Sequence, residues 1–240
     1  HRDLHMEYRR QRQMCIRDRA EAAKLVTAVE AHPRIEVLRN STVTGRYDHN
    51  WVSVLERSHP TAPERLIRAR AGSRVVAAGL VERPYVFAGN DTPGVMLSGA
   101  VRRLINLWAV KPGRRAVVLS ANTQGDSTID DLRAAGVEIV ASLDARVGED
   151  IASVEGRGRA RKVTLSDGRT VNADLVVTAT GWTAPTSLLN MAGDRPVYDP
   201  VAARYFPDSL PDDVLATGGI VGDGSTQELV DHGSSTGQLA

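Results

Sequence analysis

Two apolar runs in the sequence end in the same way, and both endings have residue types suited to holding a dinucleotide. They are VVAAGLVERP (75–84) and VVTATGWTAP (176–185), in which small residues and Gly79 or Gly181 follow the valines. A glycine at the carboxyl end of a strand allows close backbone approach to a dinucleotide, at the edge where open α/β sheets bind ligands. Two ordinary strand-to-loop turns would also use glycine. Because the ending occurs twice, the sequence favours two dinucleotide-type sites.

A third candidate is the glycine-rich stretch ATGGIVGDGST (216–226), which contributes Gly218, Gly219, Ile220 and Gly222. An apolar strand precedes it, and the S-x-x-E pattern at 225–228 is a capping box that predicts the start of a helix. A helix N-terminus behind glycines presents free N–H groups to a phosphate or a flavin carbonyl. The alternative is a flexible loop.

The middle of the chain contains a weaker candidate. Its strand at 115–120 is followed by ANTQGDS, which holds only Gly125 and lacks G-x-G-x-x-G. Asp144 follows the next strand, about where a ribose-binding acid would lie, although a solvated turn aspartate is an equal alternative. Gly156 and Gly158 lie in a basic hairpin tip, GRGRAR, rather than between a strand and a helix.

No residue pattern in the chain predicts a catalytic or metal-binding residue. There is no G-x-S-x-G or Cys/His nucleophile motif, and the six histidines show no metal-ligand spacing. The single cysteine, Cys15, excludes an intrachain disulfide and a CxxC pair. Glu82 and Arg83 would contact a cofactor or simply pair with each other.

The elements that must position these residues alternate between strands and helices, which predicts an α/β fold. Antiparallel meanders precede both valine-rich strands. We expect helices at 20–31, 95–110, 126–135 and from 226 onward, and strands at 35–38, 42–47, 51–56, 65–70, 74–78, 115–120, 137–141, 151–155, 162–165, 170–172, 175–179 and 214–216.

Composition excludes several classes of protein. With 240 residues, 42% hydrophobic and 25% charged, the chain is globular and has room for one large or two small domains. A net charge of +1 is too small for a nucleic-acid-binding excess. No apolar run approaches the ~20 residues that cross a bilayer. We therefore expect a cytoplasmic protein that binds neither nucleic acid nor membrane.

The first nineteen residues differ from the rest, with six arginines and three acidic residues. A basic arm for phosphate or anionic lipid is one interpretation, but an apolar targeting core is missing. YRRQRQMCIRDR (8–19) also resembles translated sequencing-adapter read-through, so we expect residues 1–19 to be non-native or disordered and exclude them from the fold.

Residues 75–119 resemble the FAD/NAD(P)-binding part of the alpha subunit of heterotetrameric sarcosine oxidases. The similarity is carried by the ERP…F…ND-PGVM-x-x-x-A run at 82–100, with further matches at 45–57, 134–146 and 197–200, and it extends from about residue 20 to the end. Related opine, secondary-amine and cyanide-forming dehydrogenase subunits share the pattern less closely.

The resemblance implies a Rossmann-type fold with two dinucleotide-binding domains, as in thioredoxin reductase, and a complex that demethylates sarcosine to glycine. It implies NAD in this subunit, with FAD as the alternative, FMN at a subunit interface, and the amine site on the beta subunit. Gly79, Arg83 and Pro84 match the first strand-end motif, Gly181 matches the second, and Gly218 and Gly219 match the closing cofactor loop. General flavin reductases have an aspartate where this chain has Gly219, which favours NAD.

The expected organisation is a first dinucleotide-binding domain formed by 20–90 and 186–240, with a second, NAD(P)-binding-like domain inserted at 91–185. No opening βαβ unit with G-x-G-x-x-G precedes residue 20, so we expect an internal, N-terminally truncated fragment. Beta and smaller oxidase subunits would be its partners and a small amine the substrate. A non-catalytic scaffold stabilised by a bound cofactor is the competing hypothesis.

Overall fold

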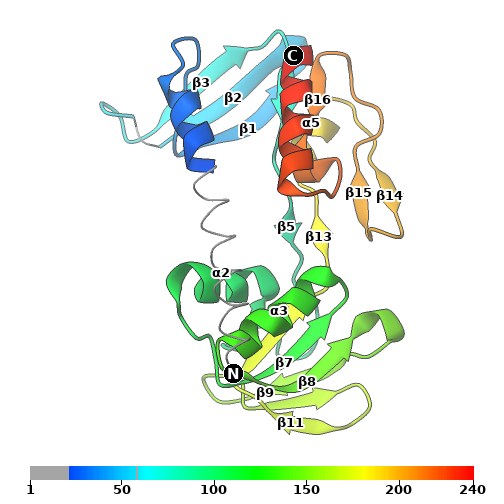
Figure 1. Ribbon diagram of the computed structural model, residues 1–240. Coiled ribbons are helices and arrows are strands. Elements are labelled where there is room, and N and C mark those ends of the chain that lie inside the picture. The colour runs from blue at the N-terminus through cyan, green and yellow to red at the C-terminus, as the bar shows by residue number, and fades with distance from the viewer. Residues whose placement is uncertain (1–21, 58) are drawn as a thin grey trace. The chain divides into compact units, whose positions relative to one another are not determined.

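The computed structural model describes residues 22–57 and 59–240, and the chain forms two compact units (Figure 1). The inserted unit is Glu82–Gly181, with residues 22–25 grouped with it. The outer unit combines Val26–Val81 with Trp182–Ala240. The chain passes from one unit to the other at two places, which we call the chain crossings, and the short strands β5 (Val81–Glu82) and β13 (Trp182–Thr183) lie there. The inserted unit thus begins and ends somewhat earlier in the sequence than the expected 91–185. Residues 1–19, with Cys15, lie outside the described residues.

A four-stranded parallel sheet forms the centre of the inserted unit, in the order β6-β12-β7-β8. These strands are β6 (Val95–Leu97), β12 (Leu175–Ala179), β7 (Arg115–Ser120) and β8 (Glu138–Asp144). Helix α2 (Ser98–Trp108) follows β6, and α3 (Thr123–Ala134) joins β7 to β8. A short 3-10 turn, η2 (Ala145–Val147), follows β8. The expected βαβ unit is therefore present.

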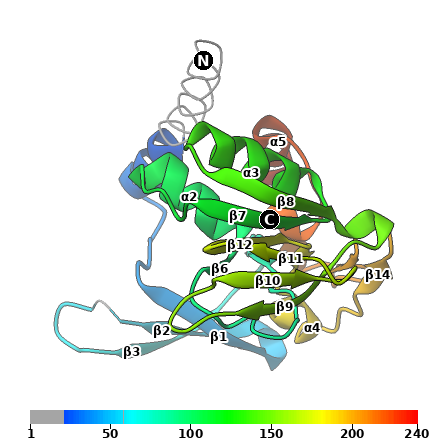
Figure 2. The same cartoon turned by 90° about the horizontal axis from the view of Figure 1, so that it is seen from below.

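The two faces of this sheet are covered by different elements, because side chains alternate along β7. Ala116 and Val118 pack against α2 and α3, whereas Val117 and Leu119 pack against an antiparallel meander on the other face (Figure 2). All four are fully buried. The meander consists of β9 (Ile151–Glu155), β10 (Lys162–Leu165) and β11 (Thr170–Asn172), in the order β11-β10-β9.

An ion pair between a half-buried arginine and a buried aspartate joins the two helices. The carboxylate of Asp131, which is fully buried on α3, accepts hydrogen bonds from Arg102 Nε at 2.8 Å and Asn106 Nδ2 at 3.0 Å. Removing one partner of such a pair would leave an uncompensated buried charge. The pair therefore fixes how α2 and α3 pack beside each other.

The outer unit contains a three-stranded antiparallel sheet and a small parallel sheet. The first is β1-β2-β3, formed by β1 (Ser41–Tyr47), β2 (Trp51–Glu56) and β3 (Arg65–Arg70), with η1 (Asp48–Asn50) between β1 and β2. The second pairs β4 (Arg74–Val76) with β16 (Val214–Ala216) in parallel. The remaining elements are α4 (Ser187–Asn190), the hairpin of β14 (Val197–Asp199) and β15 (Arg204–Phe206), η3 (Gly218–Ile220) and α5 (Thr226–Leu239).

The predicted meanders, the valine-rich strands and the capping box are confirmed, and two element predictions are wrong. Residues 35–38 form no strand: Ile35 and Val37 are 46% and 43% exposed, without a partner strand to pair with. The helix expected at 95–110 begins only at Ser98, because Val95–Leu97 pair in parallel with Val176–Thr178 of β12. The helix expected at 20–31 covers 22–31 of the described residues.

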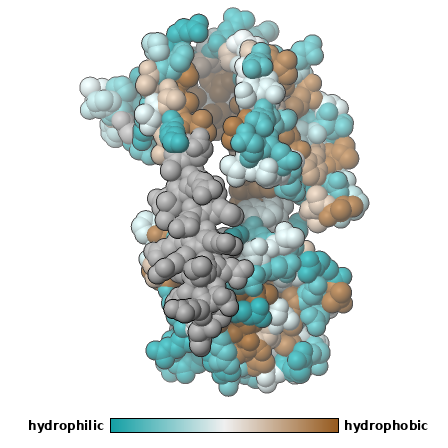
Figure 3. All heavy atoms as spheres, in the orientation of Figure 1, coloured by the Kyte–Doolittle hydropathy of each residue, from teal (hydrophilic) through white to brown (hydrophobic). Residues whose placement is uncertain are grey.

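Both units also expose apolar side chains. Tyr47, Leu66 and Val75 of the outer unit are 55%, 63% and 41% exposed, and Trp108 at the end of α2 is 71% exposed. Apolar residues are accordingly visible at the surface in Figure 3. The three-stranded sheet of the outer unit is thus only partly covered by the described residues.

Candidate functional site

The carboxyl ends of β4 and β16 bring two of the predicted glycines together in the outer unit. Gly79 has φ +67, a left-handed conformation that side chains with a Cβ adopt at a cost. A Cβ placed on Gly219 would lie 3.9 Å from Gly79 Cα and 3.3 Å from Leu80 Cγ. Neither glycine carries a side chain at this strand edge, and the Leu80 side chain is the group nearest to Gly219.

The glycine-rich stretch after β16 continues this edge. Gly218 has φ +76, Ile220 is fully buried beneath it, and a Cβ on Gly222 would meet nothing within 4 Å. The Thr217 N–H donates to Val76 O at 3.0 Å, which holds the start of the loop against β4. The backbone at Gly218 and Gly222 is therefore not covered by side chains, and the buried Ile220 packs against the core between them.

Helix α5 begins directly after this loop, as the capping box predicted. Ser225 Oγ accepts from the Glu228 N–H at 3.3 Å, and the Glu228 carboxylate accepts from the Ser225 N–H at 2.7 Å. The Ser225 N–H and the Ser225 hydroxyl both donate to the Glu228 carboxylate, and these two hydrogen bonds hold the pKa of Glu228 below its ordinary value. Thr217 Oγ1 lies 2.8 Å from His232 Nδ1, which ties α5 to the end of β16.

Three other predicted residues lie together beside the chain crossings, within the inserted unit. The Arg83 N–H donates to Gly181 O at 2.9 Å, and its guanidinium donates to Thr180 O at 3.4 Å. A Cβ on Gly181, which has φ +141, would lie 3.0 Å from Arg83 Nη2. Arg83 and Pro84 are both exposed. This arrangement fastens one crossing to the other.

Glu82 and Arg83 do not pair with each other, because Glu82 caps a helix instead. Its carboxylate accepts from the Gly99 N–H at 2.8 Å and from Ser98 Oγ, at the start of α2. Gln124 Nε2 of α3 donates to Ser98 Oγ at 2.9 Å. A carboxylate is stabilised at a helix N-terminus by the free N–H groups and the helix dipole. Sequence reasoning missed this role, since residues 82 and 99 are brought together only by the fold.

The loop after β7 stands where the first glycine-rich turn of a dinucleotide-binding βαβ unit would be, and its own side chains fill it. Asn122 Oδ1 accepts from the N–H groups of Gln124 and Gly125, at 3.1 and 3.2 Å. These are the groups that a pyrophosphate would need at the start of α3. Ser120 Oγ is hydrogen-bonded to Asn122 O at 2.9 Å and to Asp126 Oδ1 at 3.0 Å. The start of α3 is therefore closed by protein groups.

Asp144 lies at the carboxyl end of β8, beside Ser120 at the end of β7. Its carboxylate accepts from the Arg146 guanidinium at 2.7 and 3.0 Å and from the Arg146 N–H at 2.9 Å. These hydrogen bonds from Arg146 lower the pKa of Asp144. Arg146 also lies 3.6 Å from Asp126. Both oxygens of Asp144 thus have partners that compete with a ribose hydroxyl.

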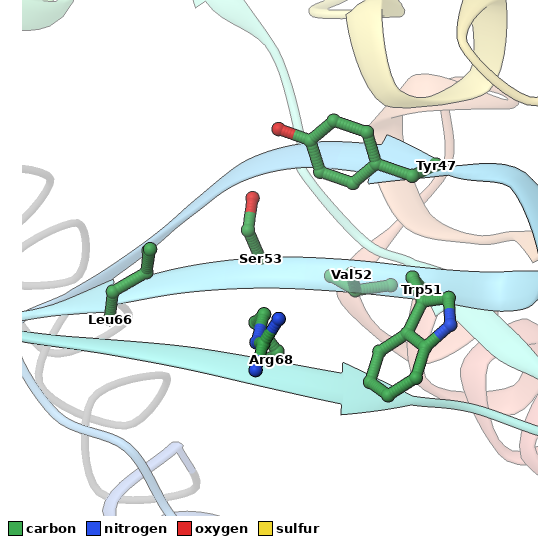
Figure 4. Close-up of a pocket in the computed structure, with 6 residues that line it drawn as sticks. All are labelled: Tyr47, Trp51, Val52, Ser53, Leu66 and Arg68. Atoms are coloured by element: carbon green, nitrogen blue, oxygen red, sulfur yellow. The ribbon is translucent and has the colours of Figure 1, made fainter.

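A separate pocket of about 360 Å³ lies on the three-stranded sheet of the outer unit (Figure 4). It is lined by Tyr47, Trp51, Val52, Ser53, Leu66 and Arg68. Its lining is mostly apolar and has no carboxylate to act as a general base. None of the sequence-predicted residues lies in this pocket.

Metal and membrane signatures are lacking in the part of the chain that the structure describes. No group of three or more His, Cys, Asp or Glu side chains there could hold a metal ion. Within residues 22–57 and 59–240, no helix is long and apolar enough to cross a bilayer.

Comparison with curated proteins identifies relatives of one kind, although no family model matches the chain. Sarcosine oxidase subunit alpha from Rhizobium meliloti (strain 1021) is 42% identical over 139 residues, which are 55% of this chain and 14% of that protein. Sarcosine oxidase subunit alpha from Corynebacterium sp. (strain P-1) is 34% identical over 182 residues, 72% of this chain and 18% of that protein. The chain is related to sarcosine oxidase subunit alpha. It spans less than a fifth of the length of these alpha subunits.

Solved structures confirm the predicted α/β, Rossmann-type fold of FAD/NAD(P)-dependent oxidoreductases. The NAD-dependent persulfide reductase from A. fulgidus superimposes with a TM-score of 0.62 at 15% identity, covering 89% of this chain and 45% of that one. The bacillithiol disulfide reductase Bdr from Bacillus cereus has a TM-score of 0.61 at 16% identity, covering 93% and 75%. The sequence relationship to sarcosine oxidase alpha therefore agrees with the fold.

Proposed function

We propose that this chain is the dinucleotide-binding part of an oxidoreductase subunit of the sarcosine oxidase alpha type. The complete complex would oxidise the secondary amine sarcosine to an imine, passing two electrons and two protons to oxygen to give hydrogen peroxide. Water would then hydrolyse the imine, breaking the N-methyl C–N bond to yield glycine and formaldehyde. The beta and smaller subunits would be its partners, and the chemistry would take place on residues outside this chain. The relatives named sarcosine oxidase subunit alpha support this proposal.

One observation carries the dinucleotide site: Gly79 and Gly219 lie side by side just after the ends of two parallel strands. Pyrophosphate and ribose approach the backbone closely at such an edge. Gly218, Ile220 and Gly222 extend the edge toward the start of α5, where the Thr226 and Gln227 N–H groups follow the capping residue.

The inserted unit is a poorer candidate, because the start of its α3 is already closed. Asn122 accepts the N–H groups that would bind a pyrophosphate, and Asp144 is bonded to Arg146. We therefore assign the dinucleotide to the outer unit, and no binding role is assigned to Asp144, Arg83, Pro84 or Gly181 of the inserted unit. We expect NAD rather than FAD at this site, because Gly219 stands where general flavin reductases have an aspartate that binds the ribityl chain. In this chain the NAD would contribute binding energy and no chemical step.

The binding site is tested by calorimetric titration of NAD, and separately of FAD, into the complete subunit. Replacing Gly79 or Gly218 with Val should weaken binding, because a β-branched residue at a positive φ is strained and fills the edge. Gly72→Val is the matched control: a Cβ there meets nothing within 4 Å, and its φ is not positive. Unchanged affinity in both test variants would remove these glycines from the site.

The activity is tested on the complex of the complete subunit with its partner subunits. Formaldehyde release and oxygen consumption should depend on sarcosine, with proline and an N-alkyl amino acid of the opine class as alternative substrates. Preference for either alternative would replace sarcosine with another secondary amine. Activity that survives loss of NAD binding in Gly79→Val would instead support the scaffold hypothesis.

A further inference from the structure

A pocket lined by arginines lies at the opposite end of the inserted unit's parallel strands. Its volume is about 340 Å³, and its lining residues are Arg114, Arg115, Arg159, Ala160, Arg161, Asn172, Ala173 and Asp174. We call it the arginine pocket. It opens where β7 and β12 begin, whereas dinucleotides bind where parallel strands end. Nothing in the proposed function uses it.

Two separate segments supply these arginines, so the cluster is a product of the fold. Arg114 and Arg115 lie at the start of β7, and Arg159 and Arg161 lie in the connection between β9 and β10. The backbone is held in place: the Ala160 N–H donates to Pro93 O at 2.8 Å. This hydrogen bond holds the β9–β10 connection against the turn that precedes β6.

The one acid in the arginine pocket is occupied by the backbone. Asp174 Oδ1 accepts from the N–H groups of Arg114 and Arg115, at 2.9 and 2.8 Å. Partial burial raises the pKa of Asp174. These hydrogen bonds and the charge of Arg159 together lower it by more than burial raises it, so the pKa of Asp174 lies below its ordinary value. Asp174 is thus ionised at neutral pH and positions the β7 arginines.

Within the part of the chain that the structure describes, three of the four arginines in the arginine pocket form no ion pair, although the ionised Asp174 offsets part of their charge through Arg159. Arg115 Nε lies 3.3 Å from Glu138, but among the described residues no carboxylate forms an ion pair with the guanidinium of Arg114, Arg159 or Arg161. All three are exposed. Guanidinium groups bind phosphate and carboxylate oxygens through paired hydrogen bonds, so converging unpaired arginines attract a multiply charged anion.

We propose that the arginine pocket binds a small phosphate-bearing anion. Small-molecule sites have volumes of about 300–1,000 Å³, and the 340 Å³ pocket lies in that range. A nucleic acid would need a longer basic surface, and the chain's net charge is only +1. The concave shape and the convergence of arginines from separate elements favour a compact ligand with two or more negative charges. The inference is independent of the proposed function.

Titration calorimetry of the 240-residue chain with inorganic pyrophosphate tests this site. We expect saturable binding of one pyrophosphate per chain, tighter than that of inorganic phosphate and weaker at higher salt. Arg159→Gln with Arg161→Gln should weaken it about tenfold or more, because charge-assisted hydrogen bonds are lost. Arg68→Gln with Arg103→Gln is the matched control, since both arginines are exposed and lie outside the pocket.

Four outcomes would overturn the proposal. The first is that pyrophosphate shows no saturable binding at about 1 mM. The second and third are that the control variant loses as much pyrophosphate affinity as the test variant, or that the test variant keeps its affinity. The fourth is that a polyglutamate peptide binds more tightly than pyrophosphate, which would make the pocket a protein-docking surface. Circular dichroism of each variant confirms its fold, and Arg114→Gln, on a different element, provides a second test variant.

Discussion

Replacing Gly125 with alanine should destabilise the inserted unit, although the same change stabilises most helices. Gly125 lies in the first turn of α3, directly above the ends of β7 and β12. A Cβ at this position would lie 2.7 Å from Ser120 Cβ and 2.9 Å from Ala179 Cβ. Both neighbours are buried strand residues, so the contact is relieved only if the helix moves away from the sheet.

The size of the effect follows from two opposing contributions. Alanine gains up to about 1 kcal/mol over glycine in a helix. Overpacking a well-packed core costs about 1–3 kcal/mol, and here three contacts, to Ser120 Oγ, Ser120 Cβ and Ala179 Cβ, are shorter than ordinary Cβ contacts. We therefore expect the free energy of unfolding to fall by about 1–2 kcal/mol.

A matched control reverses the sign. A Cβ on Gly237 of α5 meets nothing within 4 Å, so Gly237→Ala should raise the free energy of unfolding by up to about 1 kcal/mol. Urea titration is combined with hydrogen exchange of the β7 amides for Gly125→Ala and of the β16 amides for Gly237→Ala, because the two glycines lie in different units, which need not unfold in one step. Ser120→Gly combined with Gly125→Ala should recover part of the loss. A Gly125→Ala chain as stable as the wild type would refute the packing argument.

Three further predictions concern single side chains. Asn122→Ala should lower the free energy of unfolding by about 0.5–2 kcal/mol in a urea titration, because two α3 N–H groups lose their acceptor. Arg146→Gln should raise the pKa of Asp144 toward its ordinary value in an NMR titration. Because the pKa of Asp144 is lower in the folded chain than in the unfolded chain, the Asp144–Arg146 interaction stabilises the wild type above the unfolded pKa, and this stabilisation is lost as the pH falls through the folded pKa. If the pKa of Asp144 did not change in Arg146→Gln, Arg146 would be excluded as the cause of the shift. Tyr85 donates to Asp150 at 2.8 Å, and this hydrogen bond, with burial, raises its pKa above 10.0, so Asp150→Asn should lower the pKa followed by ultraviolet absorbance.

Local features of the molecule could be predicted from the sequence because neighbouring residues decide them. Strands β2, β3, β9, β10, β11 and β12 begin and end where alternation and turn residues predict. The capping box at Ser225 is likewise a contact between residues three apart. The positive φ values of Gly79, Gly181 and Gly218 agree with strand-end motifs that need glycine. Their role in binding a dinucleotide stays a prediction.

Tertiary structure alone decided the features that depend on distant residues. Val95–Leu97 form a strand because β12, about eighty residues later, offers a parallel partner, and no local pattern encodes that pairing. Glu82 caps α2 because the chain crossing ends beside Ser98. The arginine pocket exists because the β9–β10 connection folds back to the start of β7. Local patterns thus predict elements and their ends, whereas long-range pairing determines which charges and backbone N–H groups remain free to bind a ligand.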